Sequence, residues 1–297
     1  MRAIVIIGLL VSAAPGLAQE LEPRSYSAAP VGTTFLIAGI GGSEGAVLFD
    51  SSLPVDEVSA ELTIAMLAFG YTFDLGGRQA RVLAVLPFAS GHIAGEVDGH
   101  AERQPMHGMA DPRIKLSVGL LGAPALEPEE FAREPRHTVV GVSLTAVPPL
   151  GAYDERRLVN LGYNRWAFKP EIGISKPLNR WTLEGYVGAW FFTTNDHYYP
   201  GEARKSQAPI LSLQGHVGYA LTRRSWLALN ATWFGGGHTH VDGTRSPDDQ
   251  RNLRLGATLS LPAGRSDSVK VVYSTGATTR RGTDFDTLTL QWQRVWF

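Results

Sequence analysis

Two histidines in the C-terminal third of the chain have a spacing that could bind a metal ion. His238 and His240 would lie on the same face of an extended strand, because side chains alternate along a strand. Three carboxylates follow them closely: Asp242, Asp248 and Asp249. Histidine nitrogens and carboxylate oxygens are zinc ligands, but the pair follows three glycines at 235–237, which predict an exposed loop. We favour a solvated loop and expect neither a metal site nor a cofactor.

A serine activated by a histidine would give a different chemistry, hydrolysis through a covalent intermediate. Ser212 and His216 share a face of the alternating segment 211–219, but they lie roughly 13 Å apart at the rise of a strand. That separation is too large for direct proton transfer. A pair drawn from different strands is the alternative that keeps lipid hydrolysis open, while the favoured expectation is that the chain is not an enzyme.

Many of the remaining ionisable and aromatic side chains fall at every second position of long alternating stretches. Lys169 and Glu171, for example, alternate with Phe168, Pro170 and Ile172. Such a set shares one face of a sheet, where charged groups can pair or be hydrated and aromatic rings can stack on a solute. The members of this set are Lys115, Lys169, Glu171, Glu184, Tyr186, Trp190, His216, Phe234, Arg254 and Lys270.

The elements that hold this set are clearest between residues 165 and 193. Apolar side chains recur at every second position on both sides of a turn signal at 176–179, which predicts a β-hairpin. Trp181 and the aromatic cluster 190–192 mark the two ends of the second strand. They are separated by about the 9–11 residues that a tilted strand needs to cross a bilayer. The hairpin is therefore expected to lie in a membrane.

The same alternation predicts about twelve strands along the whole chain. Their expected ranges are 33–41, 60–74, 81–93, 111–121, 138–147, 166–175, 181–191, 211–219, 226–234, 252–261, 269–278 and 286–297. The connections tend to alternate between long loops and short turns, with 122–136 and 280–284 as exceptions. An even number of antiparallel strands joined in this way is typical of outer-membrane barrels. We predict an all-β fold, a closed antiparallel transmembrane β-barrel of the outer-membrane type.

The composition agrees with an exported barrel. The chain has 297 residues, a formal net charge of −1 and no cysteine, so neither nucleic-acid binding nor a disulfide framework is expected. Residues 1–18 have the basic start, short apolar run and small-residue cleavage site of a secretory signal peptide. We interpret residues 19–30 as a periplasmic lead-in and residues 31–297 as a single barrel domain. A soluble all-β secreted domain is the alternative that composition alone leaves open.

The chain ends on Trp296 and Phe297, an aromatic terminus that resembles the signal read by the barrel-insertion machinery. The apolar face that runs from Leu288 to Trp292 does not include Phe297, which falls on the opposite face. A β-bulge near Gln293 is expected to reconcile the two, because a bulge shifts the alternation by one residue.

Four stretches of the chain resemble an outer-membrane family that is named for the meta-pathway of phenol degradation. They are LEPRSYSAAPVGTTFLIAGIGGSEG, DPRIKLSVGLLGAPAL, GYNRWAFKPEIGISKPLNRWTLEGYVGAWFFT and YSTGATTRRGTDFDTLTLQWQ. The resemblance covers nearly all of the chain after residue 18. It implies a channel-like transporter barrel in bacteria that metabolise aromatic compounds, and it brings no catalytic motif.

These observations predict a channel in the outer membrane of a Gram-negative bacterium, for passive passage of small solutes that include aromatic or hydrophobic compounds. The ten residues of the alternating set would line a narrow lumen. In the alternative, the charges pair with one another and fill the interior, which leaves a plugged ligand-binding or structural barrel. The expected partners are outer-membrane lipid, the barrel-insertion machinery through Phe297, a small-molecule solute and, as an option left open, a second copy of the chain.

Overall fold

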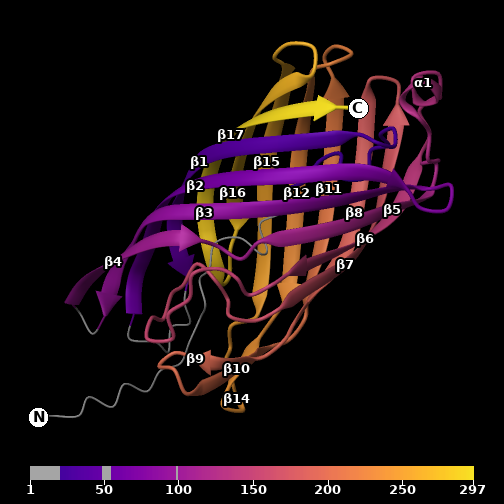
Figure 1. Cartoon of the computed structure of the whole chain (residues 1–297). Coiled ribbons are helices and arrows are strands. Elements are labelled where there is room, and N and C mark those ends of the chain that lie inside the picture. The colour runs from indigo at the N-terminus through magenta and orange to yellow at the C-terminus, as the bar shows by residue number, and fades with distance from the viewer. Residues whose placement is uncertain (1–20, 49–54, 98–99) are drawn as a thin grey trace, which may run out of the picture.

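The computed structural model describes residues 21–48, 55–97 and 100–297. The predicted signal peptide, residues 1–18, lies outside the described residues. The described chain folds into one closed β-barrel, with a short helix at one end and a small additional sheet at the other (Figure 1). No helix within these residues is long and apolar enough to cross a membrane.

Twelve strand positions form the barrel wall. Eleven of them are single strands: β1 (Thr34–Leu48), β2 (Val55–Asp74), β3 (Gln79–Val97), β6 (Val139–Val147), β7 (Ala167–Leu178), β8 (Trp181–Phe192), β11 (Ile210–Ala220), β12 (Trp226–Gly236), β15 (Gln250–Pro262), β16 (Asp267–Thr278) and β17 (Gly282–Trp296). The twelfth position is shared by β4 (His100–Met109) and β5 (Arg113–Leu121), which both pair with β3. The predicted fold class and strand number are confirmed.

The wall closes between its first and last strands. Thr34 of β1 pairs with Trp296 of β17, and the antiparallel register runs without a shift to the pair formed by Leu48 and Gly282. The bulge expected near Gln293 is therefore wrong, since Gln293 pairs in continuous register with β1 and with β16. Closure gives the backbone N–H and C=O groups of the first and last strands hydrogen-bond partners, which lipid hydrocarbon could not supply.

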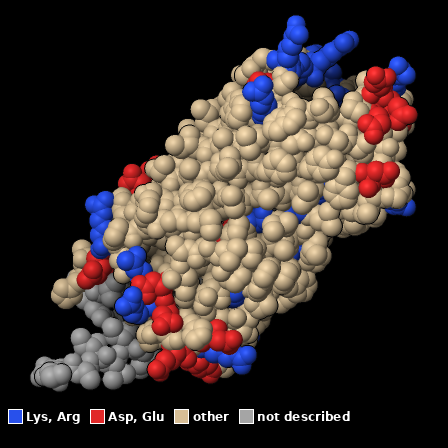
Figure 2. Space-filling model, viewed as in Figure 1, with Lys and Arg blue, Asp and Glu red and all other residues tan. Residues whose placement is uncertain are grey.

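Side chains alternate between the two faces of this wall, and apolar side chains predominate on the outward face. On β8, Val187 is 49% exposed whereas its neighbour Tyr186 is 2% exposed. Figure 2 shows the result on the visible face, a broad belt almost free of charge, with Lys, Arg, Asp and Glu gathered toward the two ends. An outward apolar belt on a closed barrel is stable in a bilayer, where no water is available to charged groups.

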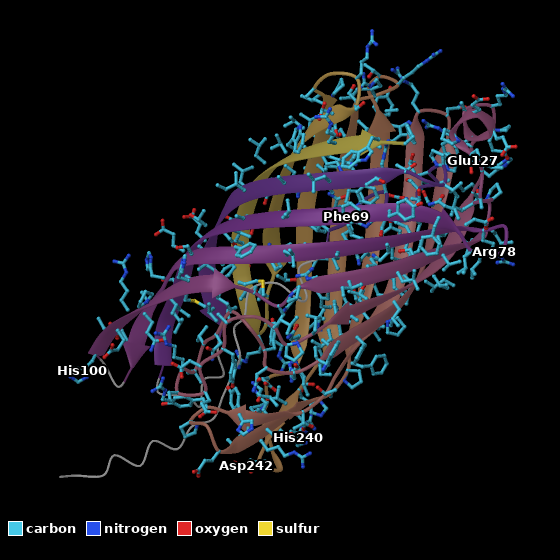
Figure 3. The ribbon with its side chains drawn as sticks, in the orientation of Figure 1. Phe69, Arg78, His100, Glu127, His240 and Asp242 are labelled. Carbon is cyan, nitrogen blue, oxygen red and sulfur yellow. The ribbon has the colours of Figure 1, made fainter. Side chains whose placement is uncertain are left out.

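The two ends of the barrel differ in the length of their connections. One end carries tight turns and the helix α1 (Pro128–Phe131), and Figure 3 places Arg78 and Glu127 there. The other end carries the long loops, with His100, His240 and Asp242. Four short strands of these loops form a separate sheet in the order β14-β13-β10-β9: β9 (Asn195–Tyr198), β10 (Ala203–Gln207), β13 (Thr239–Val241) and β14 (Thr244–Arg245). The connection between β5 and β6 is longer than its neighbours at its end, as expected for 122–136.

Several strands continue past the ranges predicted from the sequence. β1 and β2 extend into the region 42–56, which alternation assigns to a loop, and the end of β3 at 94–97 pairs with the start of β4 at 100–103 in the region 94–110, where a polar loop is predicted. The difference has a physical cause. Paired strands that extend beyond the bilayer need no apolar face toward lipid. These extensions therefore lack the alternation of apolar and polar side chains by which the other strands are found.

The extended strands bury a hydrophobic cluster at the long-loop end. Apolar side chains on the inner face of the wall pack against the loop 148–166, which contributes Val159 and Leu161. The wall residues of this cluster are Val47, Val58, Ala60, Leu62, Ala89, Ile93, Met106 and Phe285. The loop also donates the Ala152 N–H to the Met109 carbonyl at 2.7 Å. The long loops therefore fold over the mouth of the barrel rather than away from it.

Candidate solute path through the barrel

The alternating set predicted from the sequence lies on the inner face of the wall. Nine of its ten members are buried, and Lys270 of β16 is partly buried. The buried members come from six strands: Lys115, Lys169, Glu171, Glu184, Tyr186, Trp190, His216, Phe234 and Arg254. The charged ones are paired with each other or with polar groups, as ions inside a barrel must be. That these residues line a solute path stays a prediction.

Glu171 of β7 is the centre of a buried ion network. Its Oε2 atom lies 2.8 Å from Lys169 Nζ and accepts a hydrogen bond of 3.2 Å from the Gln214 amide. Its Oε1 atom lies 3.5 Å from Lys115 Nζ. Both carboxylate oxygens are therefore engaged, and the network joins three different strands across the interior.

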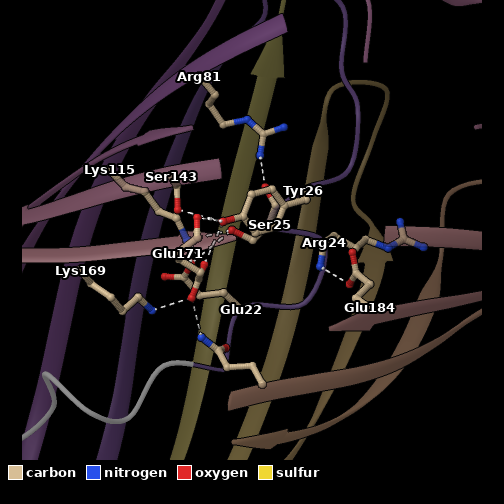
Figure 4. Close-up of polar contacts among 11 residues, drawn as sticks. Glu22, Arg24, Ser25, Tyr26, Arg81, Lys115, Ser143, Lys169, Glu171 and Glu184 are labelled. Atoms are coloured by element: carbon tan, nitrogen blue, oxygen red, sulfur yellow. Dashed lines mark hydrogen bonds and ion pairs between the residues drawn. The ribbon is translucent and has the colours of Figure 1, made fainter. Parts of the chain in front are cut away.

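The first described residues occupy the interior as well. In this N-terminal segment, defined as residues 21–33, Glu22 accepts a 2.9 Å bond from Lys115, and the Arg24 N–H donates to Glu184 at 2.6 Å (Figure 4). The sequence places residues 19–30 in a periplasmic lead-in, whereas these contacts place residues 22–26 among the inward-facing side chains. The cause is the charge of the wall, which gives a polar segment partners that it would otherwise find in water.

Tyr26 fills the middle of this segment. Its hydroxyl lies 2.9 Å from Ser143 Oγ and donates to Glu171 at 3.1 Å (Figure 4). Its ring packs edge-on against Tyr186, with centroids 5.0 Å apart. A Cβ added at Gly173 would lie 2.2 Å from this ring, and one at Gly141 would lie 2.7 Å from it. The two glycines are paired across β6 and β7 and so make the seat for the ring.

The N-terminal segment leaves the interior at the end with tight turns. Arg81 of β3 donates to the carbonyls of Ser25 and Ser27, at 3.2 and 2.9 Å. Beyond them the Ala29 N–H donates to Gln79 Oε1 at 2.7 Å, next to the turn between β2 and β3. From there the chain continues directly into β1.

An apolar layer lies between this polar centre and the long loops on the side of the barrel that five neighbouring strands form. It consists of Val147, Ala167, Trp190, Ile210 and Phe234. Most of these residues stand at or near the strand ends that lead into the long loops. The ammonium of Lys169 lies 5.4 Å from the centre of the Trp190 ring, so a cation–π contact links the layer to the ion network.

The histidine pair that could bind a metal and the histidine that could activate a serine both have other partners in the structure. The rings of His238 and His240 lie 5.3 Å apart, and His238 Nδ1 is 3.4 Å from Asp249. Within the described ranges, no three His, Cys, Asp or Glu side chains are placed to hold a metal ion. His216 Nδ1 lies 2.9 Å from Asn230 Oδ1, so its ring is held by an amide.

Five residues inside the barrel or under its long loops were not predicted from the sequence. Glu22, Arg24 and Tyr26 stand in a stretch without alternation, and Arg165 and Lys205 stand in predicted loops. One signal was available for Tyr26: inward-facing glycines in neighbouring strands leave a gap that some side chain must fill.

Solved structures of outer-membrane barrels share this architecture. An outer membrane channel from Pseudomonas putida F1 superimposes with a TM-score of 0.78 at 19% sequence identity, over 93% of this chain and all of that one. The beta domain of the Bordetella autotransporter BrkA reaches 0.52 at 10% identity, over 89% of this chain and all of that one. At these identities the likeness shows the fold. Among curated proteins, no match was found.

The family comparison covers most of the chain. The sequence profile of one family, described as "Putative MetA-pathway of phenol degradation", matches residues 41–292. The match includes all of the wall strands apart from the start of β1 and the end of β17. The chain belongs to this outer-membrane family of the phenol-degradation meta-pathway.

Proposed function

We propose that the protein is a channel in the outer membrane of a Gram-negative bacterium and that this structure is its closed state. The observation that carries the proposal is the wall itself, apolar outside and lined with paired charges inside. A structural barrel has no need of so many inward-facing ions, because burying them costs free energy. The family name and the channel from Pseudomonas putida F1 support the same function.

The N-terminal segment closes the channel at its polar centre. The hydrogen bonds that residues 21–30 make with the wall each involve at least one side chain, such as the pair formed by Glu22 and Lys115 or the hydroxyl of Tyr26, whereas Gly32 and Thr33 exchange backbone hydrogen bonds with Thr72 of β2. Residues 21–30 can therefore leave the interior without breaking the backbone ladder of the barrel. Departure would expose Lys115, Glu171 and Glu184 to water, which hydrates them in place of the segment.

Conductance through single molecules tests this arrangement. The protein refolded into planar bilayers is expected to conduct weakly, and a variant that lacks residues 21–28 is expected to conduct several-fold more. Tyr26→Ala, which keeps the chain length, should raise the time spent in the conducting state. Tyr71→Ala is the matched control, because Tyr71 is an outward-facing tyrosine. Absence of conductance and of solute flux in all variants would contradict the channel and favour a plugged barrel.

The solute class proposed is small aromatic compounds, because the apolar layer offers Trp190 and Phe234 to a ring. Uptake of phenol into vesicles should fall in Trp190→Ala if the layer selects aromatic rings. Trp181→Ala is the control, since Trp181 faces outward and is 49% exposed. Ligand-dependent stabilisation without flux would instead indicate a binding barrel. We also propose that the barrel-insertion machinery recognises Phe297 and that the chains associate into oligomers.

A further inference from the structure

A small cavity lies under the long loops, outside the apolar layer. It is lined by residues from three elements: Tyr153, Tyr163 and Arg165 from the loop 148–166, Asn195 and Tyr198 from β9, and Lys205 from β10. The cavity has a volume of about 20 Å³, and roughly 10–15 Å³ is enough for one water molecule. It therefore has room for one water or one monatomic ion.

Arg165 brings unsatisfied hydrogen-bond donors to this cavity. The side chain is 5% exposed, and its guanidinium lies 4.5 Å from the centre of the Phe192 ring. One terminal nitrogen donates to Gln207 Oε1. The other terminal nitrogen and Nε find no acceptor among the described residues. A buried cationic donor without an acceptor is costly, and an anion in the cavity would remove that cost.

Lys205 adds a second buried positive charge on another side of the cavity. It is 2% exposed, and its ammonium lies 4.6 Å from the centre of the Tyr198 ring. Desolvation by burial, and then repulsion from Arg165, lower the pKa of Lys205 to about 7. The two cations thus act on each other in a space from which most water is excluded.

The nearby carboxylates are already engaged by other groups. Asp248 accepts from the backbone N–H of Thr239 at 2.8 Å and from its hydroxyl at 2.7 Å. Asp111 accepts from the backbone N–H groups of Gly151 and Tyr163, both at 2.7 Å. These two side chains lower the positive potential of the region, but their oxygens are engaged by backbone N–H groups and by the Thr239 hydroxyl, which leaves the two Arg165 donors unmet.

We propose that this cavity is a binding site for one small anion of the size of chloride, held by Arg165 and Lys205. The bound anion would link the loop 148–166 to the small sheet β14-β13-β10-β9, and these two parts together form the cap over the mouth of the barrel. The proposal does not depend on whether solutes cross the barrel, because it concerns the cap alone. A monatomic anion needs the least room in such a space, so halides are the ligands to test.

Crystals grown in sodium bromide would test the site directly by anomalous scattering. We expect a bromide peak between Arg165 and Lys205 in the wild type and none in Arg165→Gln. Arg204→Gln is the matched control, because Arg204 is next to Lys205 on β10 but points to Asp196 with 70% of its side chain exposed. A peak that persists in Arg165→Gln would mark an adventitious ion only and would overturn the proposal, as would the absence of a peak in the wild type.

Thermal unfolding in solution gives a second measurement. At constant ionic strength, replacing gluconate by chloride should raise the Tm of the wild type and of Arg204→Gln. In Arg165→Gln the chloride concentration for half of the effect should rise at least about tenfold, because a charge-assisted pair of donors is lost. If that variant does not fold, Lys205→Met serves in its place with the same expected direction. Equal chloride effects in the variant and the wild type would overturn the proposal, whereas a channel without flux but with this chloride effect would leave it standing.

Discussion

At the scale of single residues, Glu171 combines two tasks. It neutralises Lys169, which is completely buried, and it accepts the hydroxyl of Tyr26 from the N-terminal segment. A carboxylate in this position couples the stability of the wall to the occupation of the interior, because both depend on the same two oxygens. Removing one partner of a buried ion pair leaves the other charge without compensation.

The change Glu171→Gln tests this coupling. We expect the free energy of unfolding in urea to fall by about 3 kcal/mol, the lower end of the range for breaking a buried pair, and the conducting time in bilayers to increase. Glu61→Gln is the control, since Glu61 is an exposed wall residue whose neighbour His92 lies 3.7 Å away. A loss of stability in Glu171→Gln equal to that of the control would contradict the assigned role.

Lys205 should make the stability of the cap depend on pH. Its pKa in the folded state is about 7, below the ordinary value of 10.5, so between these values the unfolded chain binds a proton that the folded chain does not. Stability therefore rises as pH increases from 7 toward 10.5. In low-chloride buffer, Lys205→Met should raise the Tm relative to the wild type at pH 6, and the difference should shrink by pH 9. The negative charge of Asp248 raises the pKa of Lys205 and so opposes this lowering. Arg165 has a pKa of about 10, so it stays charged over most of the range from pH 7 to 10.5. A difference that does not change with pH would contradict this assignment.

At the scale of elements, the paired glycines of β6 and β7 explain how the segment is seated. Gly141 and Gly173 face the interior side by side, and the Tyr26 ring occupies the space that two side chains would fill. Leu21 is seated in the same way, since a Cβ at Gly256 would lie 2.6 Å from its side chain. The fit between wall and segment is thus encoded in strands far away in the sequence.

Gly173→Ala should expel the ring of Tyr26. The added methyl group would stand 2.2 Å from the ring in the present arrangement, so the segment must shift, and the conductance should approach that of the variant without residues 21–28. Gly215→Ala on β11 is the control, because a Cβ there meets nothing within 4 Å. Unchanged conductance in Gly173→Ala, with the barrel folded, would show that the seat of Tyr26 does not keep the channel closed.

Alternation found the elements whose two faces meet different surroundings. β7 and β8 were predicted closely, because one face contacts lipid and the other the interior. The pairing of β3 with β4 was missed, since both faces there meet water or loops. The N-terminal segment was missed for another reason: Glu22 and Tyr26 find their partners 93 and 117 residues away, and no local pattern announces such contacts.

At the scale of the whole molecule, the outward belt defines where lipid must be. Leu229 of β12 and Leu150 of the loop 148–166 are equally exposed, at 62%, but only Leu229 lies on the belt. Exposure alone therefore treats them as equivalent. The surrounding medium distinguishes them, because a charge in the hydrocarbon region is costly and a charge in water is not.

Arginine substitutions make this difference measurable. In lipid vesicles, Leu229→Arg should lower the free energy of unfolding by about 2–4 kcal/mol, the cost of an arginine near the middle of the bilayer. Leu150→Arg should have little effect. Equal effects of the two substitutions would mean that the belt does not contact lipid, and the membrane assignment would fail with it.

The segment that closes this barrel is covalently continuous with β1, the strand beside it. Its effective concentration at its seat is therefore on the order of millimolar, as for a short flexible tether, and it is the same in every molecule, however many copies a cell makes. A free peptide of the same sequence would have to be added at a concentration on the order of millimolar to occlude a barrel from which residues 21–28 had been deleted. The number of protein copies in the cell therefore cannot control whether the N-terminal segment occupies the interior. Only events that weaken its bonds with Lys115, Glu171 and Glu184 can release it.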